Sequence, residues 1–348
     1  MDERLRLEAS RAFIWTLVIG LAVLAVYLSY SLLVIFGALV FGALVDGFVR
    51  LLGRALPIAR GWRVALALLL IGGFLYWLVQ FAGGQISREA AALPTIINTQ
   101  LLRLANWAQA RGLEFGVEDI RGLASTLSSG VGTVTRAIGG LVGGLTTFAL
   151  IVIIGIYFAI DPKLYERGVA WMVVRTHREA FLDTLTHQAR TLRRLLAGRV
   201  LGMVIEGLLT WVMLAHGGAL FGLDPVPMAA LLGLLTGLLA FIPNIGALIS
   251  GLLMVLVGFS GGSEMGFYTI AVYFVVQNFD GYFLVPYIAK KTVDLAPALV
   301  LSAQLVFGVL FGILGLALAD PLLAMIKVGL ERRAARIDQM DALEAETG

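Results

Sequence analysis

The sequence predicts an all-α polytopic membrane protein with about six full transmembrane helices, two re-entrant helical hairpins and an extracytoplasmic amphipathic helical region. Hydrophobic residues make up 59% of the chain and charged residues only 14%, whereas soluble domains carry about 25% charged residues. Several uncharged runs reach the roughly 20 residues that a helix needs to cross a bilayer. Two further uncharged runs are interrupted at their centres by proline or glycine. These patterns predict eight hydrophobic elements.

Residues 1–82 are predicted to form the first three transmembrane helices. Ala12–Val45 is a 34-residue run without a charge. It is too long for one untilted span, so we expect two helices with a break near Ser29–Ser31. The block Asp46–Arg63 holds four arginines and one acid, which is typical of a cytoplasmic loop. Val64–Phe81 is the third predicted span.

Residues 83–137 form a polar region in which acidic and basic residues are nearly balanced. Apolar residues recur there at helical spacing, namely at Leu93, Ile97, Leu101, Leu104 and Ala108. This spacing favours amphipathic helices packed outside the bilayer, on its extracytoplasmic side. Residues 138–160 are the fourth predicted span, which ends before Asp161-Pro162.

Residues 161–198 are predicted to be cytoplasmic basic amphipathic helices. Eight Lys and Arg residues stand against three acids between Lys163 and Arg199, and such an excess marks the cytoplasmic side. Arg190, Arg193 and Arg194 are most simply explained as a solvated or headgroup-facing surface. Residues 329–348 form a cytoplasmic tail, so both termini are expected on the cytoplasmic side of a bacterial inner membrane.

Residues 199–328 are predicted to be a transport core with two hairpins, 227–259 and 297–328. Each hairpin run contains halves too short to cross a bilayer alone. The pattern Asp-x-x-Pro begins at Asp224 before the first run and at Asp294 before the second. In each run a Phe follows the proline of this pattern by fourteen residues, at Phe241 and Phe311. With the basic clusters kept inside, the two span-plus-hairpin units run in opposite senses, as in many secondary transporters.

Glu206 is the leading candidate for a proton or cation site, because a carboxylate inside a span is costly unless it faces a cavity or a partner. Thr210 shares its helical face. The alternative is structural: Arg199 lies on the same face and would snorkel and pair loosely with Glu206.

Other candidate ion or substrate-binding residues lie in the sixth span and at the centres of the hairpins. They are Gln277, Asn278, Asp280, Pro243, Asn244, Gly312 and Gly315. Each has an alternative explanation: solvation at the membrane interface for Asp280, a plain kink for Pro243-Asn244, and close helix packing for the two glycines.

Several classes of function lack their usual residues. The chain has no Cys and three His, none at a metal-binding spacing. It has no Walker A loop, no Rossmann glycine pattern and no GxSxG motif. We therefore expect no enzyme activity, no cofactor, no bound metal and no nucleic-acid partner; the expected partners are the lipid bilayer, a small-molecule or ion substrate, and further copies of the chain in a homo-oligomer.

Six motifs together resemble the autoinducer-2 exporter (AI-2E) family of bacterial permeases. They are Phe158–Pro162, Phe241–Gly246, Gln277–Pro286, Ala296–Leu299, Phe311–Gly315 and Asp320–Leu322. The resemblance implies a multi-pass permease that exports the quorum-sensing furanone or a related molecule, or exchanges Na⁺ or Li⁺ for H⁺. The chain departs from the pattern at Asp280, where many members have Glu, and at Asp320, where a small apolar residue is common.

The sequence leaves three hypotheses for function. The first is a secondary active exporter of a small solute, such as an autoinducer-2-like signal, coupled to an ion or proton gradient. The second is a Na⁺(Li⁺)/H⁺ antiporter that uses the same residues. The third is a membrane scaffold or sensor without transport activity, whose exterior helices bind a partner.

Overall fold

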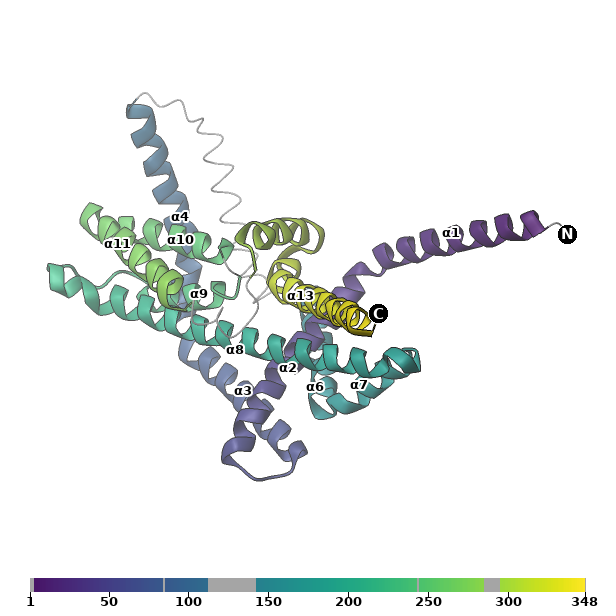
Figure 1. Ribbon diagram of the computed structural model, residues 1–348. Helices are drawn as coiled ribbons and strands as arrows, with labels where there is room; N and C mark the ends of the chain where they lie inside the picture. The colour runs from purple at the N-terminus through teal and green to yellow at the C-terminus, as the bar shows by residue number, and fades with distance from the viewer. Residues whose placement is uncertain (1–2, 84, 112–141, 243, 285–294, 348) are drawn as a thin grey trace.

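The computed structural model describes residues 3–83, 85–111, 142–242, 244–284 and 295–347, and within these ranges it contains helices and no strands (Figure 1). The longer helices are α1 (Glu3–Tyr27), α2 (Ser29–Ala55), α3 (Arg60–Gly83), α4 (Gln85–Ala110), α6 (Val142–Ile160), α7 (Pro162–Trp171), α8 (Arg178–His216), α9 (Ala229–Leu239), α10 (Ile245–Ser260), α11 (Ser263–Phe279) and α13 (Pro297–Thr347). Short turns lie at Arg175–His177, Gly217–Phe221 and Asp280–Leu284, the last a π-helical turn named η3.

The first long apolar run is divided into α1 and α2 at Leu28, one residue before the predicted break. Helix α1 projects away from the other helices (Figure 1). Helix α2 instead packs closely on α6. The two backbones approach so closely at Gly42 that an added Cβ atom would lie 2.9 Å from the carbonyl oxygen of Gly155. Small residues of this kind allow membrane helices to approach backbone to backbone.

Helix α8 runs unbroken for 39 residues, about 58 Å, through the predicted boundary at residue 198. Its first half carries most of the basic residues, and its second half is largely apolar, with Arg199, Glu206 and the terminal His216 as its ionisable residues. The second half packs on α9 at glycines: a Cβ at Gly207 would lie 3.0 Å from the Gly233 oxygen, and one at Gly237 would lie 2.7 Å from the Met203 oxygen. One rigid helix therefore joins the basic region to the predicted transport core.

The first predicted hairpin, 227–259, contains two short helices, α9 and α10, joined by a tight turn. Asn244 in this turn has a positive φ of 61°. The position of a Cβ at Gly246 would overlap the carbonyl oxygen of Leu239, so the two helix ends touch. Buried residues of both helices share one apolar core with α4 and α11.

The second predicted hairpin, 297–328, lies within α13, where the chain reverses at Gly312. Gly312 has a φ of 62° and a ψ of −142°, which no helix contains. In a straight helix Gln304 and Asp320 would be about 24 Å apart, yet the Gln304 amide donates to the Asp320 carboxylate at 3.1 Å. The segments 297–311 and 313–347 therefore fold back on one another.

The second segment of α13 then runs antiparallel along the first half of α8. The Gln188 amide donates to the Met325 oxygen at 2.9 Å, and Arg332 contacts Asp183 at 3.4 Å. Leu192, Leu195 and Leu196 of α8 pack with residues of α2 and α13 in a second apolar core. The reversal at Gly312 thus brings this part of the chain against α8.

Helix α4 follows the predicted amphipathic pattern in part. Leu93, Ile97 and Leu101 are buried against α9 and α10. Leu104 is 51% exposed, so its prediction as part of the buried stripe was wrong; the stripe continues at Ala105, because a spacing of four keeps residues on this face. The remainder of the predicted extracytoplasmic region, 112–137, lies outside the described residues.

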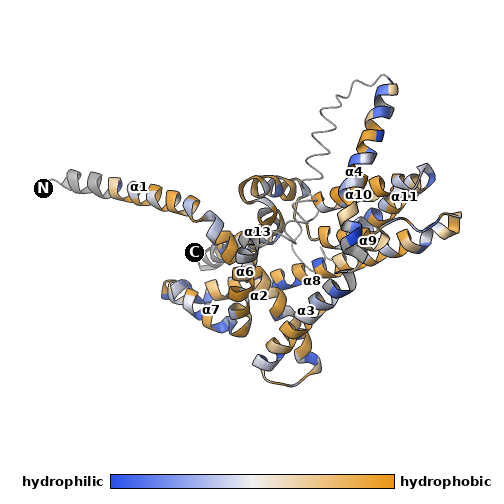
Figure 2. Ribbon diagram, turned by 180° about the vertical axis from the view of Figure 1, so that it is seen from behind, coloured by the Kyte–Doolittle hydropathy of each residue, from blue (hydrophilic) through white to orange (hydrophobic). Residues whose placement is uncertain are grey.

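By length and apolar composition, three helical segments within the described ranges are able to cross a membrane: 29–55, 175–221 and 297–339. A fourth is the pair α6 and α7, which bends by 89° at Asp161. Because the chain reverses at Gly312, the segment 297–339 is not one straight crossing. Six full crossings therefore stay a prediction. The all-helical membrane class agrees with the hydrophobic residues along these helices (Figure 2), many of which are exposed.

Candidate functional site

Charged and amide side chains from three distant parts of the chain meet inside the helical core. We name Arg199, Glu206, Asp280, Gln304 and Asp320 the acidic cluster. Helix α8 supplies the first two residues, η3 supplies Asp280, and the two segments of α13 supply Gln304 and Asp320. Glu206 is 7% exposed, Asp320 6% and Gln304 0%. Such burial of carboxylates requires compensating partners.

Arg199 is the cation at the centre of this cluster. Its guanidinium donates to the Asp320 carboxylate at 2.8 Å. The Gln304 amide completes the arrangement by donating to the other oxygen of Asp320. Arg199 also lies close enough to Glu206 and Asp280 to attract both carboxylates. The direct ion pair is therefore with Asp320, whereas the sequence had suggested a loose pair with Glu206.

The side chains of Glu206 and Asp280 lie close enough to hydrogen-bond to one another. Two ionised carboxylates have only acceptor oxygens, so a hydrogen bond between them requires a proton on one of the two. Such a pair of neighbouring carboxyl groups is able to share one proton. Arg199 lies next to three carboxyl groups, and a second negative charge at close range disfavours ionisation of both carboxyl groups of a pair.

Thr210 lies one helical turn beyond Glu206 and is fully buried. Its hydroxyl oxygen has no hydrogen-bond partner among the described residues, and neither has the side-chain oxygen of Gln304. An unpartnered buried oxygen is costly and marks a place where water, an ion or a ligand would be bound favourably. Both atoms come from residues on or next to the acidic cluster.

The other predicted site residues have no hydrogen bond or ion pair with the cluster among the described contacts. Asn278 is exposed and donates to the Phe274 oxygen of its own helix, while Gln277 is half-buried. Asn244 is exposed at the turn between α9 and α10, and Pro243 lies outside the described residues. Gly312 makes the reversal of α13, and Gly315 abuts the Phe307 oxygen. The two glycines thus have a structural role in the hairpin turn.

Sequence reasoning missed two members of the cluster, Gln304 and Asp320. Gln304 could have been recognised from the sequence as a candidate site residue, because it is an amide side chain within the apolar run Pro297–Ala319. Asp320 was noted only as a departure from a family pattern and as a helix breaker. Among the described residues, no group of three or more His, Cys, Asp or Glu is arranged to hold a metal ion.

Comparisons with known proteins identify relatives over most of this chain. The sequence profile of the family described as AI-2E family transporter matches residues 12–334. The putative transport protein YrrI of Bacillus subtilis is 30% identical over 207 residues, which are 57% of this chain and 55% of YrrI. The putative permease PerM of Escherichia coli is 26% identical over 203 residues, 58% of this chain and 56% of PerM.

The AI-2 transport protein TqsA of Escherichia coli is 34% identical over 134 residues, 38% of this chain and 36% of TqsA. The aligned part of this chain spans about half the length of YrrI and PerM.

Proposed function

This chain belongs to the AI-2E transporter family, and from that premise we propose that it is a secondary transporter that couples movement of a small solute to protons held by Glu206 and Asp280. The observation that carries the proposal is the burial of Glu206 and Asp320 around a single arginine, Arg199, with Asp280 beside Glu206. Intramembrane ionisable groups of this kind are typical of proton relays in transporters.

The coupling step follows from competition for Arg199. While the pair holds its proton, Arg199 bonds to Asp320 and ties α8 to the second segment of α13. Loss of the proton leaves Glu206 and Asp280 both charged, and they attract the guanidinium away from Asp320. The ion pair between α8 and the hairpin of α13 is then lost while their other contacts remain, so the hairpin is able to move and change access to the core. Differential stabilisation of two states by one proton is what coupling requires.

The surrounding architecture suits such a mechanism. The helical hairpins at Asn244 and Gly312 are proposed to be re-entrant and to enter the bilayer from opposite faces as an inverted repeat. Both turns have a residue with positive φ, and at both a following glycine abuts a carbonyl oxygen of the preceding helix. We place the protein in the bacterial inner membrane with both termini cytoplasmic, as a homo-oligomer.

The first solute to test is the autoinducer AI-2, because the relative TqsA is named an AI-2 transport protein. The expected direction is export. In proteoliposomes containing the purified full-length chain, an imposed pH gradient should drive AI-2 flux. Glu206→Gln should reduce this flux to the level of liposomes without protein, because the amide keeps the shape but does not gain or lose a proton in this pH range.

Asp183→Asn is the matched control, since Asp183 is an exposed carboxylate on the same helix, outside the cluster. It should leave gradient-driven flux unchanged. Equal flux and equal pH dependence in wild type and Glu206→Gln would contradict proton coupling at this residue. Absence of any flux from the wild type, for every solute and ion tested, would favour a scaffold or sensor.

A second candidate, Na⁺(Li⁺)/H⁺ antiport, is favoured by the unpartnered oxygen of Thr210. Buried oxygens of Thr, Glu and Asp side chains are suitable ligands for a hard cation. If antiport is the function, a Na⁺ or Li⁺ gradient alone drives proton movement in the same proteoliposomes. Thr210→Val should then weaken the cation response and leave a solute-driven response unchanged.

A further inference from the structure

A second charged region lies less than two helical turns from the acidic cluster along α8, where one buried carboxylate is shared by three arginines. Asp46 is 5% exposed. Its carboxylate accepts from Arg60 at 2.6 Å, from Arg50 at 2.8 Å and from Arg193 at 3.2 Å. One negative charge cannot neutralise three positive charges, so this region keeps an excess of positive charge.

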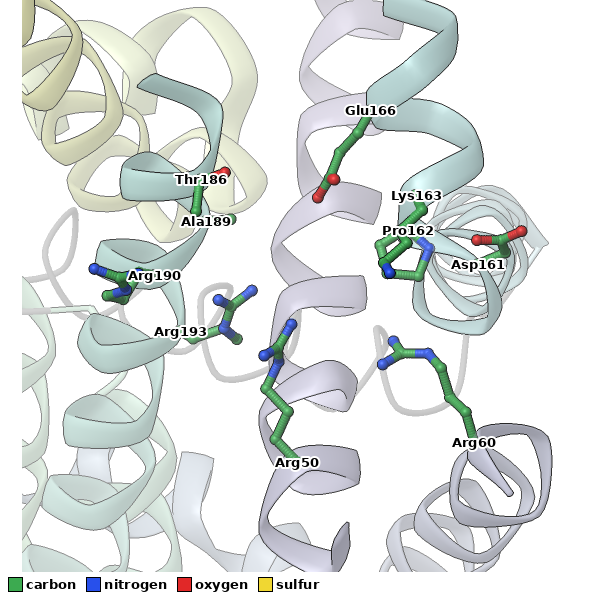
Figure 3. A pocket seen from close by; sticks show the side chains of 10 residues that line it. All are labelled: Arg50, Arg60, Asp161, Pro162, Lys163, Glu166, Thr186, Ala189, Arg190 and Arg193. Carbon is green, nitrogen blue, oxygen red and sulfur yellow. The ribbon is translucent and has the colours of Figure 1, made fainter. Parts of the chain in front are cut away.

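A pocket of about 450 Å³ opens beside this group, between α2, α3, α7 and α8 (Figure 3). Five cationic side chains line it against two carboxylates, together with three uncharged residues. The lining residues are Arg50, Arg60, Asp161, Pro162, Lys163, Glu166, Thr186, Ala189, Arg190 and Arg193. We name it the basic pocket.

Some of these charges already have a structural role. Arg60 donates to the Ala159 and Ile160 oxygens and so caps the carboxyl end of α6. Asp161 accepts from the Leu164 backbone amide and caps the start of α7. These contacts fix the walls of the basic pocket. One of the two carboxylates in its lining, Asp161, is already bonded to the backbone.

Other cations in the basic pocket have unused donors. Within the part of the chain that the structure describes, Lys163 and Arg190 have no ion-pair partner within 4 Å. Arg50 and Arg193 each spend one nitrogen on Asp46, and the two guanidinium groups lie close enough to repel each other. An anion bound between them would remove this repulsion and accept their free N–H groups.

The position of the basic pocket indicates what kind of anion reaches it. Helix α6 is apolar up to Ile160, and α7 turns from it by 89°. Leu164, Trp171 and Met172 on and just after α7 expose 57%, 78% and 79% of their surface. An amphipathic helix that follows a span at a right angle and exposes Trp is typical of the membrane interface, where lipid phosphates lie.

We propose that the basic pocket binds a phosphate group, supplied by an anionic lipid headgroup or by a soluble phosphate. Four groups hold it: Lys163 and Arg190 by charge, and Arg50 and Arg193 by their free guanidinium N–H groups. Glu166 also lines the pocket (Figure 3) and opposes the anion. Basic pockets between membrane helices bind phospholipid headgroups in this way.

The test compares lipid binding to the purified full-length chain in a neutral detergent, measured by native mass spectrometry. Short-chain phosphatidylglycerol is titrated against phosphatidylcholine of the same chain length, and inorganic phosphate is titrated separately against chloride. We expect the double variant Lys163→Gln/Arg190→Gln to bind phosphatidylglycerol roughly tenfold or more weakly. Glu166→Gln should bind it more tightly.

Arg175→Gln is the matched control, because Arg175 is an exposed arginine between α7 and α8 that does not line the pocket. It should bind phosphatidylglycerol as the wild type does. If inorganic phosphate alone shows the dependence on Lys163 and Arg190, the site stands and its ligand is soluble. Equal binding of both lipids and of phosphate by the wild type and the double variant would overturn the proposal, as would equal losses in Arg175→Gln.

Discussion

Arg199 is one cation next to three carboxyl groups, whereas Asp46 is one carboxylate that forms ion pairs with three arginines. Both groups are attached to α8, at Arg193 and Arg199, so a single helix carries two opposite imbalances of charge. The imbalance around Arg199 lies in the helical core, where we propose that a proton corrects it. The imbalance around Asp46 borders an open pocket, where water and anions reach the arginines. Burial therefore decides whether unpaired charge is titrated or is left to bind a ligand.

The largest effect is expected when Arg199, the cation of the acidic cluster, is replaced. Arg199→Met should destabilise the detergent-solubilised protein by about 3 to 5 kcal/mol, because it leaves the buried Asp320 carboxylate without its ion-pair partner. The midpoint of thermal unfolding, followed by tryptophan fluorescence, measures the change. Arg199→Lys keeps the charge and should lose less stability. A midpoint equal to that of the wild type in Arg199→Met would show that the cluster does not depend on this cation.

A smaller effect is expected when Asp46, the carboxylate bonded to three arginines, is replaced. Asp46→Asn should destabilise the protein by about 1 to 3 kcal/mol, since the side chains of Arg50, Arg60 and Arg193 are 59%, 33% and 21% exposed and water solvates them in part. The same variant should bind phosphatidylglycerol more tightly, because the pocket gains positive charge.

These two opposite changes are measured on one sample, by thermal unfolding and by lipid titration. Asp183→Asn is again the control, because its pair with Arg332 is exposed and weak, and neither quantity should change. Weaker lipid binding in Asp46→Asn would show that the arginines need Asp46 to hold their positions and that their excess charge is not what binds the anion.

Much of the architecture could be predicted from the sequence because it depends on local patterns. Apolar runs of span length, the break near Ser29 and the turns at Asn244 and Gly312 follow from composition and from residues that interrupt helices. Glu206 and Asp280 were identified because a carboxylate in an apolar run needs an explanation. That their side chains lie next to one another required the structure.

The remainder of the site depends on contacts between residues distant along the chain. Asp320 meets Arg199 only because α13 reverses at Gly312 and its second segment runs back along α8. No local pattern reports this antiparallel pairing, so Asp320 was explained as a helix breaker and Gln304 was missed. The unbroken length of α8 was also not predicted, since its polar and apolar halves resemble two separate elements.

The central claim is that Glu206 and Asp280 share a proton in the resting protein, and infrared spectroscopy of the carboxyl groups tests it most directly. Wild-type protein at neutral pH should show an absorption band of a protonated carboxyl group that is lost in Glu206→Gln and in Asp280→Asn, while Asp183→Asn keeps it. A wild-type spectrum without such a band, or a band that persists in both variants, would contradict the account.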